Sequence, residues 1–317
     1  MHKIEKQASP KLAKRSPVLK PKVSSTGIKK VIIPVGGFGT RFLPATKAQP
    51  KEMLPIVDKP VIQYLVEEAA KSGIEQIILV TGKGKRAIED HFDYASELEA
   101  FLESKGKSDL AKKVRDISSL ALFSYVRQKE PKGIGDAILQ AYHLVIDGEP
   151  VAVMSGDDII DGDVPALKQL MKVYEKYRAP VVALWKIPLS EVHKYGIIKG
   201  KKVAPRTWRL AGMVEKPKAE DAPSDLMVIV KYILTPEIFR YLAKTKPAPN
   251  GEIYITDAVD KYIKDGGKMY GYEVKGQYYD CGDKLGYLKA TVNFALKHQE
   301  IGKDFRKYLK DVKLTGD

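Results

Sequence analysis

Short apolar runs alternate with amphipathic segments along most of the chain, and this order constrains the fold more than any other feature. The apolar runs predict strands at 31–35, 77–80, 122–126, 151–154, 181–185, 228–234 and 269–274, and the wholly apolar ones among them are typical of buried strands. Apolar residues at helical spacing predict helices at 60–73, 85–92, 97–114, 133–145, 165–177, 256–264 and 284–297. Strands buried on both faces and joined by helices form a mainly parallel, doubly wound α/β sheet.

Composition divides the 317 residues into three parts. Residues 1–28 are predicted to be a disordered basic tail, because nine of the first 30 residues are Lys or Arg, one is Glu and none is aromatic. Residues 29–300 are predicted to form one α/β domain, and residues 301–317 a C-terminal helical extension. The charged stretch 97–114 is interpreted as an insertion or a lid.

The formal net charge of +14 is concentrated in the tail, so the domain itself is only mildly basic. This suits a protein that binds small anions, and the domain lacks the interleaved basic and aromatic residues that nucleic-acid binding requires. No apolar run of about 18 residues occurs, and no apolar segment follows the first charges, which argues against a membrane span and a secretory signal. The single cysteine, Cys281, favours a reducing, cytoplasmic compartment.

A glycine turn with a fixed cation follows the first predicted strand, in the segment Gly36-Gly37-Phe38-Gly39-Thr40-Arg41. It is not a dinucleotide fingerprint, because Phe42 stands where that motif needs a small residue, and it is not a P-loop. Glycines let backbone N–H groups approach phosphate oxygens, and Lys51 is restrained by flanking prolines. The turn and its two cations indicate a polyphosphate site; a purely structural turn with solvated cations is the alternative.

Two aspartates are predicted to lie at the same edge of the sheet. Asp157 comes shortly after the strand 151–154, and Asp280 follows a later strand. Ligands of open α/β sheets bind at the carboxyl ends of strands, and Mg²⁺ takes one or two carboxylates together with phosphate oxygens and water. These aspartates are therefore candidate metal ligands, with the capping of a following turn or helix as the alternative.

The segment from about residue 29 to 296 resembles the bacterial UTP–glucose-1-phosphate uridylyltransferases, also called UDP-glucose pyrophosphorylases, of the sugar nucleotidyltransferase family. The glycine-arginine turn is typical of sugar nucleotidyltransferases in general. The resemblance to this family is more specific because it extends over the segments 37–44, 45–55, 58–64, 133–137, 214–217, 251–253, 256–258 and 279–287.

The resemblance implies a Rossmann-like α/β/α nucleotidyltransferase fold with a mixed, mainly parallel central sheet over residues 29–300. It implies nucleotide contacts, including those to the base, by Gly36, Gly37, Gly39, Thr40, Gln128 and Gly133. The residues expected to act on phosphate groups are Arg41, Lys51 and Lys216. Those expected to hold the sugar phosphate are Gly196, Glu215 and Lys216, and Mg²⁺ is expected at Asp157 and Asp280.

The implied reaction is uridylyl transfer from UTP to glucose-1-phosphate, which gives UDP-glucose and pyrophosphate by Mg²⁺-assisted in-line attack. The resemblance also favours a homo-oligomer, a dimer or tetramer. Two alternatives stay open at this stage. The first is the same chemistry with dTTP, because the amide of Gln128 can pair with either uracil or thymine. The second is a catalytically weak regulatory paralogue that binds sugar nucleotides.

Overall fold

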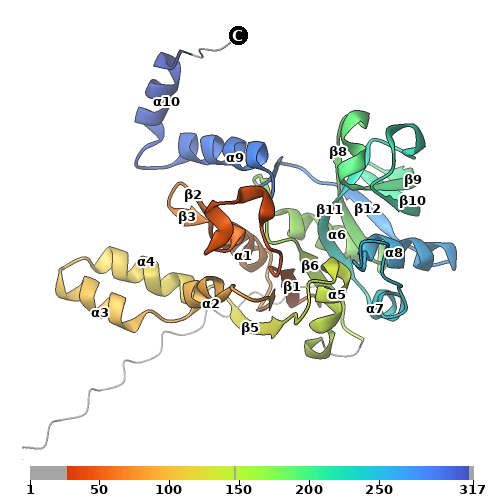
Figure 1. Cartoon of the computed structure of the whole chain (residues 1–317), viewed down its shortest axis with the longest axis horizontal. Helices are drawn as coiled ribbons and strands as arrows, with labels where there is room; N and C mark the ends of the chain where they lie inside the picture. Colours follow the sequence, from red (N-terminus) through yellow and green to blue (C-terminus); the bar gives the residue numbers. More distant parts are fainter. Residues whose placement is uncertain (1–26, 146–147, 314–317) are drawn as a thin grey trace, which may run out of the picture.

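The computed structural model describes residues 27–145 and 148–313 (Figure 1). Of the predicted basic tail, residues 1–26 lie outside the described residues, as do 314–317 of the predicted C-terminal extension. Ile28 is fully buried in the core, so the packed part of the chain already includes this residue. Within the described residues, no helix is long and apolar enough to cross a membrane.

A mixed sheet forms the centre of the fold. In the described part of the chain it has nine strands, in the order β5 (Leu122–Arg127), β4 (Gln76–Thr81), β1 (Lys30–Pro34), β6 (Val151–Met154), β11 (Leu226–Leu234), β8 (Val181–Lys186), β12 (Tyr270–Glu273), β10 (Thr207–Glu215) and β9 (Gly196–Ala204). Strands β5, β4, β1 and β6 are parallel, and so are β8 and β12, whereas β11 and β10 run antiparallel to their neighbours. The expected mixed, mainly parallel sheet is confirmed.

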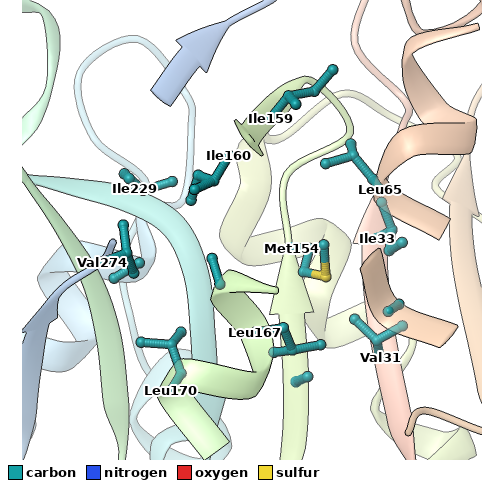
Figure 2. Packing of buried hydrophobic residues seen from close by; sticks show 14 of the residues in the cluster. Val31, Ile33, Leu65, Met154, Ile159, Ile160, Leu167, Leu170, Ile229 and Val274 are labelled. Atoms are coloured by element: carbon teal, nitrogen blue, oxygen red, sulfur yellow. The ribbon is translucent and has the colours of Figure 1, made fainter. Parts of the chain in front are cut away.

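Helices cover both faces of this sheet. One face carries α1 (Val61–Lys71), α2 (Arg86–Phe92) and α6 (Ala166–Tyr177), and the other carries α5 (Gly133–Gln140), α7 (Pro236–Leu242) and α8 (Ile255–Lys264). Side chains alternate between the faces along β1: Val31 and Ile33 belong to the first core cluster and Ile32 to the second. Figure 2 shows Val31 and Ile33 beside Leu65 of α1 and Leu167 of α6. The expected α/β/α layering is confirmed.

A buried ion pair joins the first helical layer to the sheet. Lys231 of β11 is fully buried, and its Nζ donates to Oε2 of Glu68 on α1 at 2.9 Å. The other carboxylate oxygen of Glu68 accepts from the backbone N–H of Leu167, the second residue of α6, at 2.9 Å. One carboxylate therefore connects α1, α6 and the central strand β11.

Two predicted helices differ from the observed ones. The stretch 97–114 is a hairpin of α3 (Ser96–Ser104) and α4 (Ser108–Ser118), which projects from the body in Figure 1. The first helix ends because Gly106 takes a left-handed φ of 68°. The predicted helix 133–145 ends earlier than expected, at Gln140, and continues as a single 3₁₀ turn at Tyr142–Leu144.

Several elements were not predicted. The region after residue 186, where shorter strands were expected, contains the nine-residue strands β9 and β10. The short strands β7 (Asp158–Asp161) and β13 (Gln277–Asp280) pair in a separate antiparallel sheet, which brings Asp158 opposite Asp280. The C-terminal helices, in contrast, lie where helices were expected: α9 (Lys284–Lys297) is followed by α10 (Gly302–Asp311), which extends away from the body (Figure 1).

Candidate active site

A cavity of about 500 Å³ opens at the edge of the sheet where β1, β5 and β6 end. The three strands point the same way, so the segments that follow them meet there. Lys51 and Asp157 line this cavity, together with all six of the predicted nucleotide-binding residues: Gly36, Gly37, Gly39, Thr40, Gln128 and Gly133. The structure thus brings these residues together, while their individual roles stay predictions.

The glycine turn packs closely against the segment that carries Lys51. Gly39 has a left-handed φ of 66°, and its carbonyl oxygen accepts from Oγ1 of Thr46 at 2.7 Å. A Cβ atom at Gly39 would lie 3.1 Å from Cβ of Lys51. A side chain at position 39 would therefore both strain the backbone and displace Lys51.

Lys51 reaches across the cavity edge to the aspartate that follows β6. Its Nζ contacts Oδ2 of Asp157, while Oδ1 of the same carboxylate accepts a hydrogen bond from Oγ of Ser155. Burial opposes charge on both groups, but each stabilises the charge of the other. For Lys51, attraction to Asp157 and Glu52 outweighs the effect of burial, so the pKa of the ammonium group is raised. For Asp157, attraction to Lys51 outweighs the effect of burial, so the pKa of the carboxyl group is lowered.

A buried ion pair fixes the turn that carries Lys51. Glu52 is 1% exposed, and its Oε2 accepts from Nζ of Lys85 at 2.8 Å. Because Glu52 is the next residue in the same 3₁₀ turn, Lys51–Met53, this pair anchors the turn that presents Lys51. This anchor was not predicted, since no local pattern marks a glutamate as buried.

Three carboxylates crowd together beside Lys51. Burial of Asp158, followed by repulsion from Asp157 and Asp280, raises the pKa of its carboxyl to about 7. Burial and then Asp157 also raise the pKa of Asp280. The hydroxyl group of Tyr278 donates a hydrogen bond to Oδ1 of Asp158 at 2.7 Å. This concentration of negative charge favours binding of a cation.

The residues fit a divalent metal ion at the expected position. A Cβ atom at Gly282 would lie 2.5 Å from Oδ2 of Asp157 and 3.0 Å from Oδ1 of Asp280, so both carboxylates converge above a residue that has no side chain. Within the ranges 27–145 and 148–313, no group of three or more His, Cys, Asp and Glu side chains is arranged to hold a metal. Asp157 and Asp280 would supply two oxygen ligands, and Mg²⁺ prefers phosphate and water as the remaining ones.

Arg41 lies near this carboxylate cluster rather than along the cavity wall. Its Nη1 donates to the carbonyl oxygen of Gly282 at 3.4 Å, and its charge contributes to lowering the pKa of Asp157. Arg41 and Lys51 therefore both stabilise the negative charge of Asp157.

The predicted sugar-phosphate residues form a second cluster, on the paired strands β9 and β10. Gly196 lies opposite Glu215 in the register of the strands, and a Cβ there would lie 3.2 Å from Oε2 of Glu215. The same oxygen accepts from Oγ1 of Thr256 at 2.8 Å. Lys216 takes a left-handed φ of 47°, and its Nζ lies 3.5 Å from Oε1 of Glu215.

Two tyrosines contact this cluster, and both were missed as site residues. Tyr254 lies under Lys216, with Nζ 5.1 Å from the ring centroid, and its hydroxyl accepts from Nδ2 of Asn250 at 2.6 Å. The backbone oxygen of Tyr195 accepts from the N–H of Lys216 at 3.0 Å, while its side-chain hydroxyl donates to Oδ2 of Asp280 at 3.5 Å. Tyr195 therefore connects the sugar-phosphate cluster to the carboxylate cluster.

The glycine turn, the candidate phosphate-binding cations and the converging aspartates lie at the carboxyl edge of a mixed α/β sheet. This arrangement is typical of proteins that carry out nucleotide-dependent phosphoryl or nucleotidyl transfer. The profile of the nucleotidyl transferase family matches residues 30–296. A UTP–glucose-1-phosphate uridylyltransferase of Staphylococcus epidermidis is 51% identical over 285 residues, which cover 90% of this chain and 98% of that protein. The protein of the same name from Bacillus subtilis is 50% identical over 274 residues, 86% of this chain and 93% of that protein.

Solved structures agree with these sequence comparisons. A UDP-glucose pyrophosphorylase complexed with UDP-glucose has a TM-score of 0.77 at 47% identity, covering 86% of this chain and all of that one. The UTP-bound UGPase from Acinetobacter baumannii has a TM-score of 0.83 at 38% identity, covering 90% of this chain and all of that one. The chain belongs to the nucleotidyl transferase family and, within it, to the group of the UTP–glucose-1-phosphate uridylyltransferases. The resemblance inferred from the sequence motifs is confirmed.

Proposed function

We propose that the chain transfers the uridylyl group of UTP to glucose-1-phosphate, releasing pyrophosphate and forming UDP-glucose. The main support for this proposal is that the cavity and the sugar-phosphate cluster lie next to each other. The cavity of the glycine turn, with Gln128 and the Lys51–Asp157 pair, adjoins the Glu215–Lys216 cluster through Tyr195. Such a junction suits a reaction that joins a nucleotide to a sugar phosphate, and the names of the uridylyltransferase relatives support it.

The chemistry needs no general base, because the phosphate of glucose-1-phosphate already carries anionic oxygens. One of these oxygens attacks the α-phosphorus of UTP. A new P–O bond forms while the bond from the α-phosphorus to the oxygen that bridges to the β-phosphate breaks, and pyrophosphate leaves with that electron pair. The barrier comes mainly from the approach of two anions and from charge that develops on the leaving group.

The cations of the chain lower this barrier by charge and by position. Arg41 and Lys51 hold the triphosphate, and Lys216 holds the phosphate of the sugar. Glu215 accepts hydrogen bonds from the sugar hydroxyls, and Thr256 fixes the orientation of its carboxylate. Gln128, which also lines the cavity, pairs with the base.

Asp157 and Asp280 would hold Mg²⁺, which fits the convergence of their oxygens above Gly282. When bound, the ion would neutralise phosphate charge during the transfer. Lys51 pairs with Asp157, which would also be a ligand of the ion. Phosphate binding at Lys51 and Mg²⁺ binding would therefore involve the same carboxylate.

Product analysis tests the proposal directly. The full chain is incubated with UTP, glucose-1-phosphate and Mg²⁺, and the products are separated by anion-exchange chromatography and identified by mass spectrometry. We expect UDP-glucose and pyrophosphate in equal amounts. Uridine monophosphate or diphosphate in place of UDP-glucose would indicate hydrolysis and overturn the proposal.

We also propose a homo-oligomer in a cytoplasmic setting. Exposed apolar side chains on and between the C-terminal helices support self-association: Leu285, Leu288, Val292, Ile301 and Tyr308. The free cysteine Cys281 is buried, which suits a reducing compartment. Light scattering of the purified chain after size-exclusion chromatography tests the association, and a monomer at micromolar concentration would overturn it.

A further inference from the structure

The side-chain amide of Gln128 has both of its hydrogens engaged within the protein. Gln128 is only 8% exposed and follows β5 at the cavity. Its Nε2 donates to Oδ2 of Asp136 at 2.6 Å and to the carbonyl oxygen of Gly133 at 3.2 Å. An amide nitrogen carries two hydrogens, so this nitrogen has none left for a ligand.

The oxygen of the same amide is the atom that faces the glycine turn. Oε1 of Gln128 lies 3.1 Å from the point that a Cβ of Gly36 would occupy, and Gly36 lines the cavity. The opposite orientation of the amide would place Oε1 against Oδ2 of Asp136, where two acceptors would repel each other. Asp136 therefore holds the amide of Gln128 with its oxygen, and not its nitrogen, toward the glycine turn.

Asp136 is itself held in place. Its second oxygen, Oδ1, accepts from Nε2 of Gln140 one helical turn later, at 3.2 Å. It lies in the first turn of α5, which is docked by a hydrogen bond from the N–H of Gly135 to the carbonyl oxygen of Ile253 at 2.9 Å. The carboxylate is thus fixed both along the helix and relative to the rest of the fold.

We propose that Asp136 is a positioning residue that makes Gln128 a pure hydrogen-bond acceptor and thereby selects a base with an N–H at its pairing edge. Uracil presents N3–H and satisfies this acceptor, whereas N3 of cytosine is itself an acceptor and is repelled. Thymine presents the same N3–H, so this device excludes cytosine without distinguishing uracil from thymine. The inference rests on the nucleotide subsite of the proposed function.

Measurements of equilibrium binding test the role of Asp136 independently of catalysis. Isothermal titration calorimetry gives the Kd of UTP and of CTP, each with Mg²⁺ and without sugar phosphate, for the wild-type chain and for D136A. Ala has the highest helix propensity, so α5 is retained in D136A. D136L fills similar space without an acceptor, and D136N keeps a carbonyl oxygen for Gln128. Q140A serves as the matched control, because it removes a contact of Asp136 but not the carboxylate.

The wild-type chain is expected to bind UTP at least about tenfold more tightly than CTP, as the loss of a hydrogen bond in a buried site predicts. D136A and D136L should reduce this ratio severalfold, D136N should preserve more of it, and Q140A should leave it near the wild-type value. Equal weakening of both nucleotides in D136A and D136L, or no preference in the wild-type chain, would overturn the inference. A wild-type chain that prefers UTP in binding but forms no UDP-glucose would overturn the proposed function alone.

Discussion

Lys51 and Asp157 are 106 residues apart in the sequence, yet their side chains form an ion pair at the carboxyl edge of the sheet. A nucleotide phosphate would compete with Asp157 for the ammonium group, and a divalent cation would compete with Lys51 for the carboxylate. Binding of either one frees a partner for the other. We therefore expect nucleotide and Mg²⁺ to bind with positive coupling, as thermodynamic linkage requires when each releases the group that the other needs.

Replacing Asp157 with Asn should weaken the dependence of the reaction on Mg²⁺. The amide keeps the shape of the side chain but removes the charge that draws the ion, so half-saturation should require at least about tenfold more Mg²⁺. Rates measured over a Mg²⁺ titration test this, with EDTA as the zero point, at which the wild-type chain should be inactive. D161N is the control, because Asp161 pairs with Lys297 outside the cluster. An unchanged titration for D157N would remove Asp157 from the metal site.

Replacing Lys216 with Ala should lower kcat/KM by roughly 10²- to 10³-fold, or about 3 kcal/mol of transition-state stabilisation. The side chain is half-exposed, so its loss should leave the melting temperature nearly unchanged. Lys218 is an exposed lysine two residues later, and K218A controls for the loss of one positive charge in the same segment. Near-normal turnover by K216A would exclude this lysine from the mechanism.

The ring of Tyr254 should contribute to sugar-phosphate binding by holding Lys216. A cation–π contact is worth about 0.5–2 kcal/mol, so Y254L should raise the KM for glucose-1-phosphate about two- to tenfold with little change in the KM for UTP. Y254F keeps the ring and loses only the hydrogen bond from Asn250, so it should remain close to wild type. Equal KM values for the two variants would show that the ring itself is unimportant.

The stability of the fold should decrease in mildly acidic solution through His91. This imidazole on α2 lies 3.0 Å from Oε1 of Gln63, and burial lowers its pKa below the ordinary value of 6.5. Between the two pKa values the unfolded chain binds more protons, so the free energy of unfolding rises with pH across this window and falls as the solution is acidified.

Urea denaturation at several pH values from about 5 to about 7.5 measures this slope. H91Q keeps an amide that can donate near Gln63 but has no titratable group, so its free energy of unfolding should depend less on pH in this range. Parallel pH profiles for the wild-type chain and H91Q would show that His91 does not contribute.

Local patterns were enough to predict the elements that position the nucleotide cavity. The apolar run before Gly36 predicted β1, and the run before Asp157 predicted β6, because buried parallel strands leave a continuous apolar signature. The rule that ligands bind at the carboxyl ends of strands then predicted that the residues following them would meet. The family resemblance contributed Gln128 and the sugar-phosphate residues, which no local pattern singles out.

The remaining parts of the site depend on contacts between distant segments. The pairing of Glu52 with Lys85, and the bridge from Tyr195 to Asp280, follow from packing that neither local sequence reveals. The strands β9 and β10 were underestimated because exposed residues interrupt the apolar pattern, among them three lysines in β9 and Arg209 in β10. In contrast, the break at Gly106 had a local signal, since glycine commonly ends a helix.

The most direct test of the central claim is pyrophosphate release by the purified chain with glucose-1-phosphate and Mg²⁺, measured in parallel with UTP, dTTP, ATP, CTP and GTP. We expect strong release with UTP and much weaker release with CTP, ATP and GTP. Comparable or faster release with dTTP would reassign the chain to thymidylyl transfer or to dual use. No release with any nucleotide, from a folded chain that still binds UDP-glucose, would exclude uridylyl transfer and favour a regulatory protein.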